Sequence, residues 1–69
     1  MRKYRQAMRR ILHMFNIAKR DKNFRTALNA LDSFWGIKLV AIADNEISVE
    51  DFEKMQNLYD TMMRYIDRM

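Results

Sequence analysis

The sequence predicts an all-α protein, a small antiparallel three-helix bundle that forms a single domain over residues 1–69. Two observations support this prediction. Proline is absent and Gly36 is the only glycine, so the chain lacks the residues that tight turns between β-strands require. Apolar residues also recur every three or four positions, which is the spacing of one helix face. The expected helices cover residues 2–19, 23–43 and 49–68.

The first segment, residues 2–19, has an apolar face and a basic face. Its apolar stripe consists of Tyr4, Ala7, Met8, Ile11, Leu12, Phe15 and Ala18. A second row lies opposite and falls within about one quarter of the helix circumference. This row contains Arg2, Arg5, Arg9, His13, Asn16 and Arg20. Because an outward basic row attracts phosphates, anionic lipid headgroups or acidic protein surfaces, these six residues are the predicted contacts to nucleic acid or to an acidic partner.

A short polar stretch over residues 19–23 separates the first two helices. Either Asp21 or Asn23 can accept from the free amide groups at the start of the second helix. Short connections make successive helices antiparallel neighbours. We expect the second helix to turn one apolar face toward the core. That face consists of Phe24, Leu28, Leu31, Trp35, Leu39 and Ile42, widened by Ala27, Ala30 and Phe34.

The second half of this helix, residues 34–43, is apolar on nearly all sides apart from Lys38. A helix of that composition is expected to be buried on more than one side. A short buried strand over residues 37–43 is the alternative, since β-branched residues recur there. Helix is favoured, because one strand has no other strand in this chain to pair with and Gly36 costs a helix only about 1 kcal/mol.

Ser48 marks the start of the third helix. Its hydroxyl can cap the helix, Asp51 follows three residues later, and Ile47 can pack on Phe52 across the first turn. Apolar residues then alternate steps of three and four and form a heptad-like seam. The seam consists of Phe52, Met55, Tyr59, Met62, Ile66 and Met69, with Leu58 and Tyr65 beside it.

Charge is distributed unequally along the chain. Residues 1–25 carry nine basic groups against one acid, a net charge of +8, whereas residues 26–69 carry four basic groups against eight acids, a net charge of −4. One interpretation is that the basic and acidic helices lie side by side and weakly neutralise each other at their edges. The other is that the basic row faces an anionic partner.

The residue types needed for catalysis or metal binding are not grouped in the sequence. His13 is the single histidine and lies among arginines, cysteine is absent, and no base adjoins Ser33 or Ser48. One histidine without thiols cannot complete a structural zinc site, and the acids near Ser48 lack the spacing and glycine of an EF-hand loop. We therefore expect no enzymatic activity, no cofactor, no metal and no small-molecule substrate.

The small size of the chain favours self-association. A domain of 69 residues buries only about 60% of the surface that its unfolded form exposes. Domains of this size commonly need a disulfide, a metal or self-association, and the composition leaves only the last. Charges recur too often in the N-terminal segment for a secretory signal, and no apolar run is long enough to span a membrane. We expect a cytoplasmic protein without a membrane partner, since a cysteine-free chain suits a reducing compartment.

These features favour a non-enzymatic regulator or adaptor that acts by protein–protein interaction and self-associates, with a homodimer completing the helical bundle. The predicted interface residues are Phe34, Trp35, Ile37, Val40 and Met63. The alternative is a nucleic-acid-binding protein whose first helix contacts phosphates. No helix-turn-helix or other recognition motif accompanies that basic helix.

Overall fold

The computed structural model describes the backbone of residues 2–44 and 47–69 and, within those ranges, the side chains from Tyr4 onward. Three α-helices follow one another along the chain: α1 (Arg2–Arg20), α2 (Phe24–Ala43) and α3 (Val49–Arg68). The predicted helices are confirmed to within one residue at each end. Within the described ranges no residue forms a strand, so the alternative of a strand over residues 37–43 is wrong.

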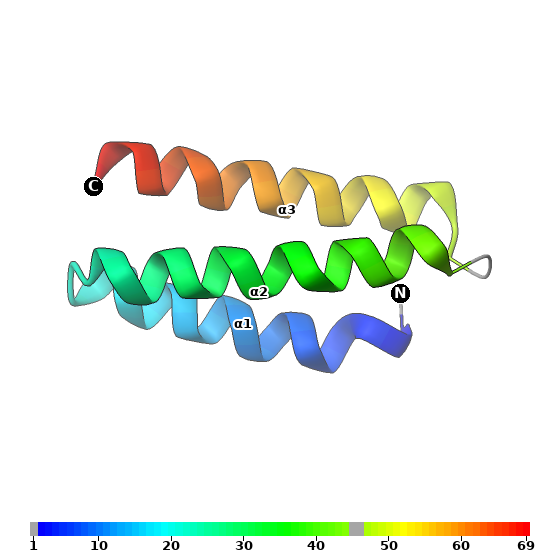
Figure 1. The fold of residues 1–69 in the computed structure, drawn as a ribbon, viewed down its shortest axis with the longest axis horizontal. Coiled ribbons are helices and arrows are strands. Elements are labelled where there is room, and N and C mark those ends of the chain that lie inside the picture. The colour runs from blue at the N-terminus through cyan, green and yellow to red at the C-terminus, as the bar shows by residue number, and fades with distance from the viewer. Residues whose placement is uncertain (1, 45–46) are drawn as a thin grey trace.

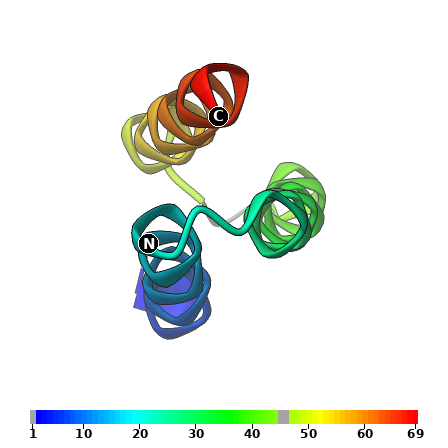
Figure 2. The same ribbon diagram turned by 90° about the vertical axis from the view of Figure 1, so that its left-hand side faces the viewer.

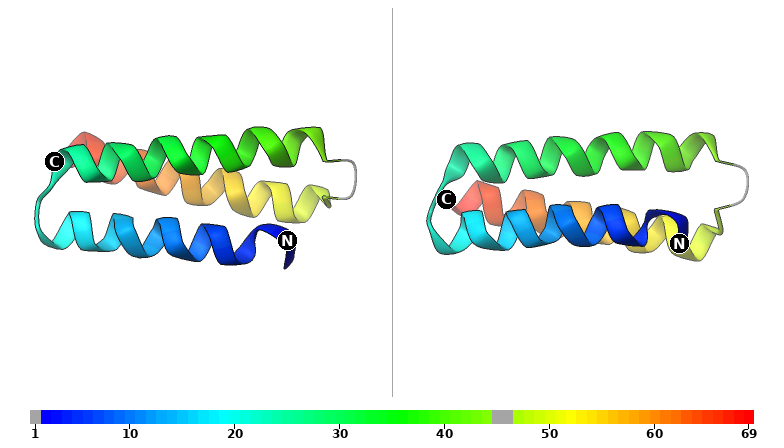
Figure 3. Two further views of the ribbon diagram at one scale, coloured as in Figure 1. Left: turned by 60° about the horizontal axis from the view of Figure 1, so that its bottom comes forward. Right: turned by 90° about the horizontal axis from the view of Figure 1, so that it is seen from below.

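The three helices form an elongated antiparallel bundle. α2 runs antiparallel to both α1 and α3 and lies between them in the view of Figure 1. Seen end-on, the three helices occupy the corners of a triangle (Figure 2). The C-terminal end of α3 lies beside the turn that joins α1 to α2 (Figure 3). The molecule measures 37 × 19 × 14 Å, so every residue lies close to the surface of a thin rod.

The turn between α1 and α2 is held by backbone and side-chain hydrogen bonds. The amide of Asn23 donates to the carbonyl of Ala18 (2.8 Å), and the amide of Lys22 donates to the carbonyl of Lys19 (3.2 Å). This is the Schellman pattern of a helix C-terminus, and it places Lys22 in the left-handed region with a φ of 55°. The side-chain oxygen of Asn23 then accepts from the amide of Thr26, so the asparagine is the cap of α2.

The predicted start of α3 is confirmed. The hydroxyl oxygen of Ser48 accepts a hydrogen bond of 3.1 Å from the amide of Asp51, which satisfies one of the free donors of the first turn. Ile47 packs against the core just before this cap. Asp44 follows the last residue of α2, where the chain leads on to α3. The hydroxyl of Tyr4 donates to the carboxylate of Asp44 and so joins α1 to the end of α2.

The core lies between the three helices and receives side chains from each of them. The contribution of α1 follows the predicted stripe, except that Ala7 is exposed and Leu12 is only half-buried. The contribution of α3 follows the predicted seam at Met55, Met62 and Ile66, and Met55 and Met62 are among the largest fully buried side chains. Phe52 and Tyr59 are half-buried, and Met69, which was also predicted in the seam, is exposed. The buried apolar residues of these two helices are Tyr4, Met8, Ile11, Phe15, Ala18, Met55, Met62 and Ile66.

The predicted core face of α2 is right for Ala27, Ala30, Leu31 and Phe34 and wrong for Phe24, Trp35, Leu39 and Ile42, which are exposed. The buried residues of this helix are Ala27, Ala30, Leu31, Phe34, Lys38 and Ala41. The centre of this buried face is rotated by about a quarter turn from the row of Phe24, Leu28, Trp35, Leu39 and Ile42. The physical reason is that α2 packs against two neighbours, and small alanine side chains allow its backbone to approach those of α1 and α3 closely. Trp35, Leu39 and Ile42 lie outside as a result, and the second half of α2 is buried on one side only within a single chain.

Candidate functional site

An exposed apolar surface runs along the whole of α2. Its residues lie on one side of the helix and are separated by three, four or seven positions, that is, by one or two helical turns. We call this surface the α2 stripe, and it consists of Phe24, Leu28, Trp35, Leu39 and Ile42. Trp35 is 44% exposed and Ile42 is 59% exposed, whereas Leu28 is half-buried. At a rise of about 1.5 Å per residue the stripe is about 27 Å long.

α3 borders this stripe on the side of Trp35. The rings of Trp35 and Tyr59 lie 5.4 Å apart, with their planes inclined by 44°. Met63 follows one turn further along α3 and is also exposed. Two of the predicted interface residues, Trp35 and Met63, therefore lie on the face that α2 and α3 share.

The other three predicted interface residues lie elsewhere. Phe34 is completely buried in the core, so a partner cannot contact its side chain in this fold. Ile37 is half-buried and Val40 is exposed on the opposite side of α2, where both line a shallow hollow against α1. The remaining residues that line this hollow are Tyr4, Ala7, Arg10, Ile11, Ser33 and Gly36. The five predicted residues do not form one patch.

Leu39 and Ile42 were expected in the core and are surface residues instead. The sequence contained one signal of this arrangement, because alanines at positions 27, 30 and 41 form a second apolar row beside the large side chains. A helix with two apolar faces can bury one of them inside the chain and present the other outside.

Lys38 is a charged residue with a buried side chain, which is only 4% exposed. Its ammonium nitrogen lies 4.8 Å from the centre of the Trp35 ring and 4.6 Å from that of Tyr59. It donates a hydrogen bond to Oε1 of Gln56, whose amide nitrogen donates in turn to Oδ1 of Asp60 (3.1 Å). Two aromatic faces and a polar chain thus stabilise a cation directly beneath the α2 stripe.

The predicted basic row of α1 lies on the outside of the bundle. We call its described members the α1 basic face, and all of them are exposed: Arg5, Arg9, His13, Asn16 and Arg20. The side chain of Arg2 lies outside the described residues. Among the described residues, neither Arg5 nor Arg9 makes a hydrogen bond or an ion pair. The Nε atom of Arg20 lies 3.2 Å from the carboxylate of its neighbour Asp21.

The acidic residues of α3 lie on a separate surface. Glu50, Glu53 and Asp67 are exposed, and Glu50 is 3.8 Å from Lys54 on the same helix. The ion pairs found among the described residues are therefore local to one helix or one turn. Exposed pairs of this kind contribute only about 0–1 kcal/mol.

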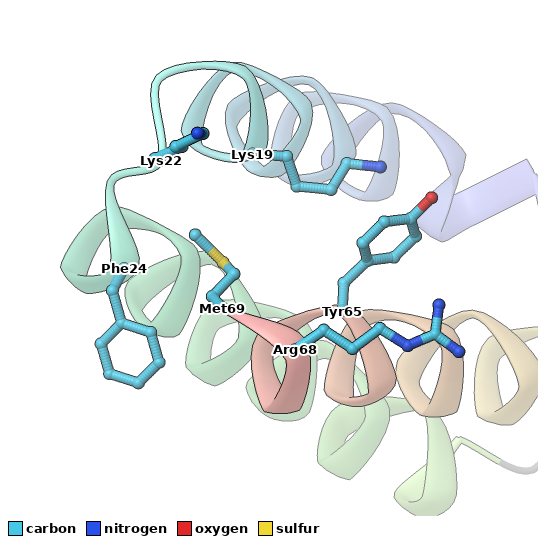
Figure 4. A pocket seen from close by; sticks show the side chains of 6 residues that line it. All are labelled: Lys19, Lys22, Phe24, Tyr65, Arg68 and Met69. Carbon is cyan, nitrogen blue, oxygen red and sulfur yellow. The ribbon is translucent and has the colours of Figure 1, made fainter.

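A pocket of about 460 Å³ lies at the end of the bundle where α1 ends, α2 begins and α3 ends (Figure 4). Its lining residues are Lys19, Lys22, Phe24, Tyr65, Arg68 and Met69. The ammonium of Lys19 lies 3.8 Å from the centre of the Tyr65 ring, while the ring of Phe24 points away from this pair (Figure 4). The three cations extend the positive charge of α1 around this end of the molecule.

The described residues include neither a cluster of metal-binding side chains nor a helix suited to a membrane. No three histidine, cysteine or carboxylate side chains gather closely enough to hold a metal ion. Among the helices described, none combines the length and apolar character needed to cross a bilayer. Comparison of the chain with protein families, curated proteins and solved structures found no match.

Proposed function

We propose that this chain is a non-enzymatic regulator or adaptor that acts by protein–protein contact, and that its first partner is a second copy of itself. The exposed α2 stripe is the observation that carries the proposal. Large apolar side chains follow one another along the entire helix, whereas monomeric proteins seldom expose contiguous apolar patches of more than a few hundred Å². The stripe is therefore a surface that a partner covers.

The total exposed area supports this inference. The folded chain exposes 5216 Å². A folded monomer of 8.4 kDa is expected to expose about 4,600 Å². The surplus of about 600 Å² is close to the roughly 800 Å² that each partner contributes to a standard interface.

The spacing of the stripe supports a second copy as the partner. Its members are placed almost symmetrically about position 33, in the middle of α2. If two α2 helices pack antiparallel, Phe24 faces the partner's Ile42 and Leu28 faces the partner's Leu39. Trp35 then packs close to the twofold axis. Self-complementarity of this kind is the requirement for a symmetric dimer.

Two adjacent residues provide a matched test. Leu39 lies in the α2 stripe and Val40 lies outside it, on another side of the helix, and both are at least half exposed. Leu39→Lys and Val40→Lys each add one positive charge near the C-terminal end of the same helix. Only the first variant places that charge in the proposed interface.

The measurement is the thermal unfolding midpoint as a function of protein concentration, followed by circular dichroism. The midpoint of a dimer rises with concentration because association stabilises the folded state. We expect this rise for the unaltered chain and for Val40→Lys, and a constant midpoint for Leu39→Lys. A constant midpoint for the unaltered chain, or the same behaviour in both variants, would overturn the proposal.

A further inference from the structure

We infer that the α1 basic face binds the phosphodiester backbone of a nucleic-acid duplex. This surface is separate from the α2 stripe, and its residues take no part in the proposed dimer contact. The inference therefore goes beyond the proposed function, and either of them can fail alone.

The spacing of the face fits a polymer of evenly spaced charges. Its members follow one another at steps of three or four residues, so neighbours lie about 4.5–6 Å apart along the helix and the row spans about 22 Å. Each strand of a duplex presents one phosphate per roughly 3.4 Å of axis. The row is thus long enough for each of its arginines to contact a different phosphate.

The side chains of the face suit phosphate chemistry. The guanidinium of arginine is always charged and can donate two parallel hydrogen bonds to phosphate oxygens. Arg5 and Arg9 are exposed and make no ion pair among the described residues, so both can contact a ligand without breaking an internal bond. Asn16 stands in the same row and adds an amide donor.

The charge around the face favours the approach of a polyanion from this side. α1 contains no acidic residue along its whole length. Three further exposed cations lie nearby. Arg10 is on the same helix, and Lys22 and Arg25 are at the end of the bundle where α1 meets α2. The exposed acids of α3 lie on another surface. A polyanion is therefore attracted to α1 and repelled from the outer side of α3.

A membrane surface fits this face less well. A helix that lies in a lipid interface inserts its apolar stripe between headgroups. The stripe of α1 is instead buried in the core through Tyr4, Met8, Ile11 and Phe15. Regular spacing along a row likewise suits a backbone of repeating phosphates better than the irregular carboxylates of an acidic protein.

The test compares two double variants that remove the same charge. Arg5→Gln with Arg9→Gln changes the α1 basic face, and Lys54→Gln with Arg64→Gln changes two exposed cations of α3. All four positions are exposed, so circular dichroism should show an unchanged fold. The probe is a fluorescently labelled, mixed-sequence DNA duplex, titrated at several salt concentrations. An RNA duplex of the same sequence, titrated in parallel, shows whether the α1 basic face prefers DNA or RNA.

The expected readout is the salt dependence of binding. Three arginine contacts per chain predict an affinity that falls about 40-fold between 50 and 200 mM salt, and one remaining contact predicts a fall of about 3.5-fold. We expect the larger fall in affinity for the unaltered chain and for the α3 variant, and the smaller fall for the α1 variant. Absence of binding at low salt, equal losses in both variants, or tighter binding to phosphatidylserine vesicles or polyglutamate would overturn the inference.

Discussion

The ammonium group of Lys38 donates a hydrogen bond to the side-chain oxygen of Gln56 and thereby joins α2 to α3 beneath the α2 stripe. Burying a charged group without partners is costly. Here the rings of Trp35 and Tyr59 face the charge, and Asp60 accepts from the other end of the glutamine amide. Lys38 meets Gln56 in only one alignment of the two helices, so this chain of hydrogen bonds favours a single register of α2 against α3.

The coupling between these two residues is testable by a double-mutant cycle. Gln56→Met removes the acceptor and leaves a buried cation unsatisfied, so we expect it to cost about 1–3 kcal/mol of unfolding free energy. Lys38→Met replaces the cation by an apolar chain of similar length and is expected to be neutral or stabilising. In the Lys38→Met background, Gln56→Met should then cost almost nothing. Urea denaturation of the four proteins measures this, and an equal cost of Gln56→Met in both backgrounds would refute the coupling.

Gly36 lies in the middle of an exposed side of α2. A Cβ atom added there meets no atom within 4 Å. Because glycine in a helix interior is less favourable than alanine, Gly36→Ala should stabilise the chain by about 0.5–1 kcal/mol. Such a change raises the melting temperature of a domain this small by several degrees, roughly 4–8 °C per kcal/mol. A lower melting temperature would mean that another segment or another copy approaches the backbone at Gly36.

Lys22 holds a left-handed backbone conformation at the end of α1. This region disfavours residues with a Cβ atom by about 1–2 kcal/mol and is the usual place of glycine in a Schellman turn. Lys22→Gly is therefore expected to raise the free energy of unfolding by up to about 1 kcal/mol, after the greater entropy of unfolded glycine is included. Lys22→Val should lower it, since a β-branched residue fits this region poorly. Thermal denaturation of the two variants measures both changes in stability. Equal changes for Lys22→Gly and Lys22→Val would contradict a left-handed conformation at Lys22.

Phe34 and Trp35 are adjacent aromatic residues with different roles. Phe34 is completely buried, whereas Trp35 is 44% exposed. Phe34→Ala should cost about 3–5 kcal/mol, which is a large part of the total stability of a small domain. Trp35→Ala should lower stability less and should affect association more. Chemical denaturation at a low protein concentration measures the loss of unfolding free energy in each variant. A small loss for Phe34→Ala would contradict the burial of that ring.

Helix positions and the outer face of α1 were predictable from sequence because they depend on local features. The cap at Ser48 and the polar turn near Asn23 set the helix limits. The basic row has the period of a single helix, so its exposure follows once the opposite face is buried. No knowledge of the neighbouring helices was needed for either prediction.

The buried face of α2 was not predictable in the same way because it depends on two neighbours. Trp35, Leu39 and Ile42 are large apolar residues that dominate the sequence pattern, yet the face of α2 that packs against α1 and α3 consists of alanines together with Leu31, Phe34 and Lys38. The burial of Lys38 depends on Gln56, which lies 18 residues further along the chain. Sequence periodicity on one helix contains no information about such a pair.

The molar mass of the unaltered chain in solution tests the central claim most directly. The proposed dimer predicts that sedimentation equilibrium at increasing protein concentration shows a mass approaching twice the 8.4 kDa of one chain. The Leu39→Lys variant should remain at the mass of one chain under the same conditions. A mass of 8.4 kDa for the unaltered chain at every concentration would contradict the claim that this surface pairs with itself.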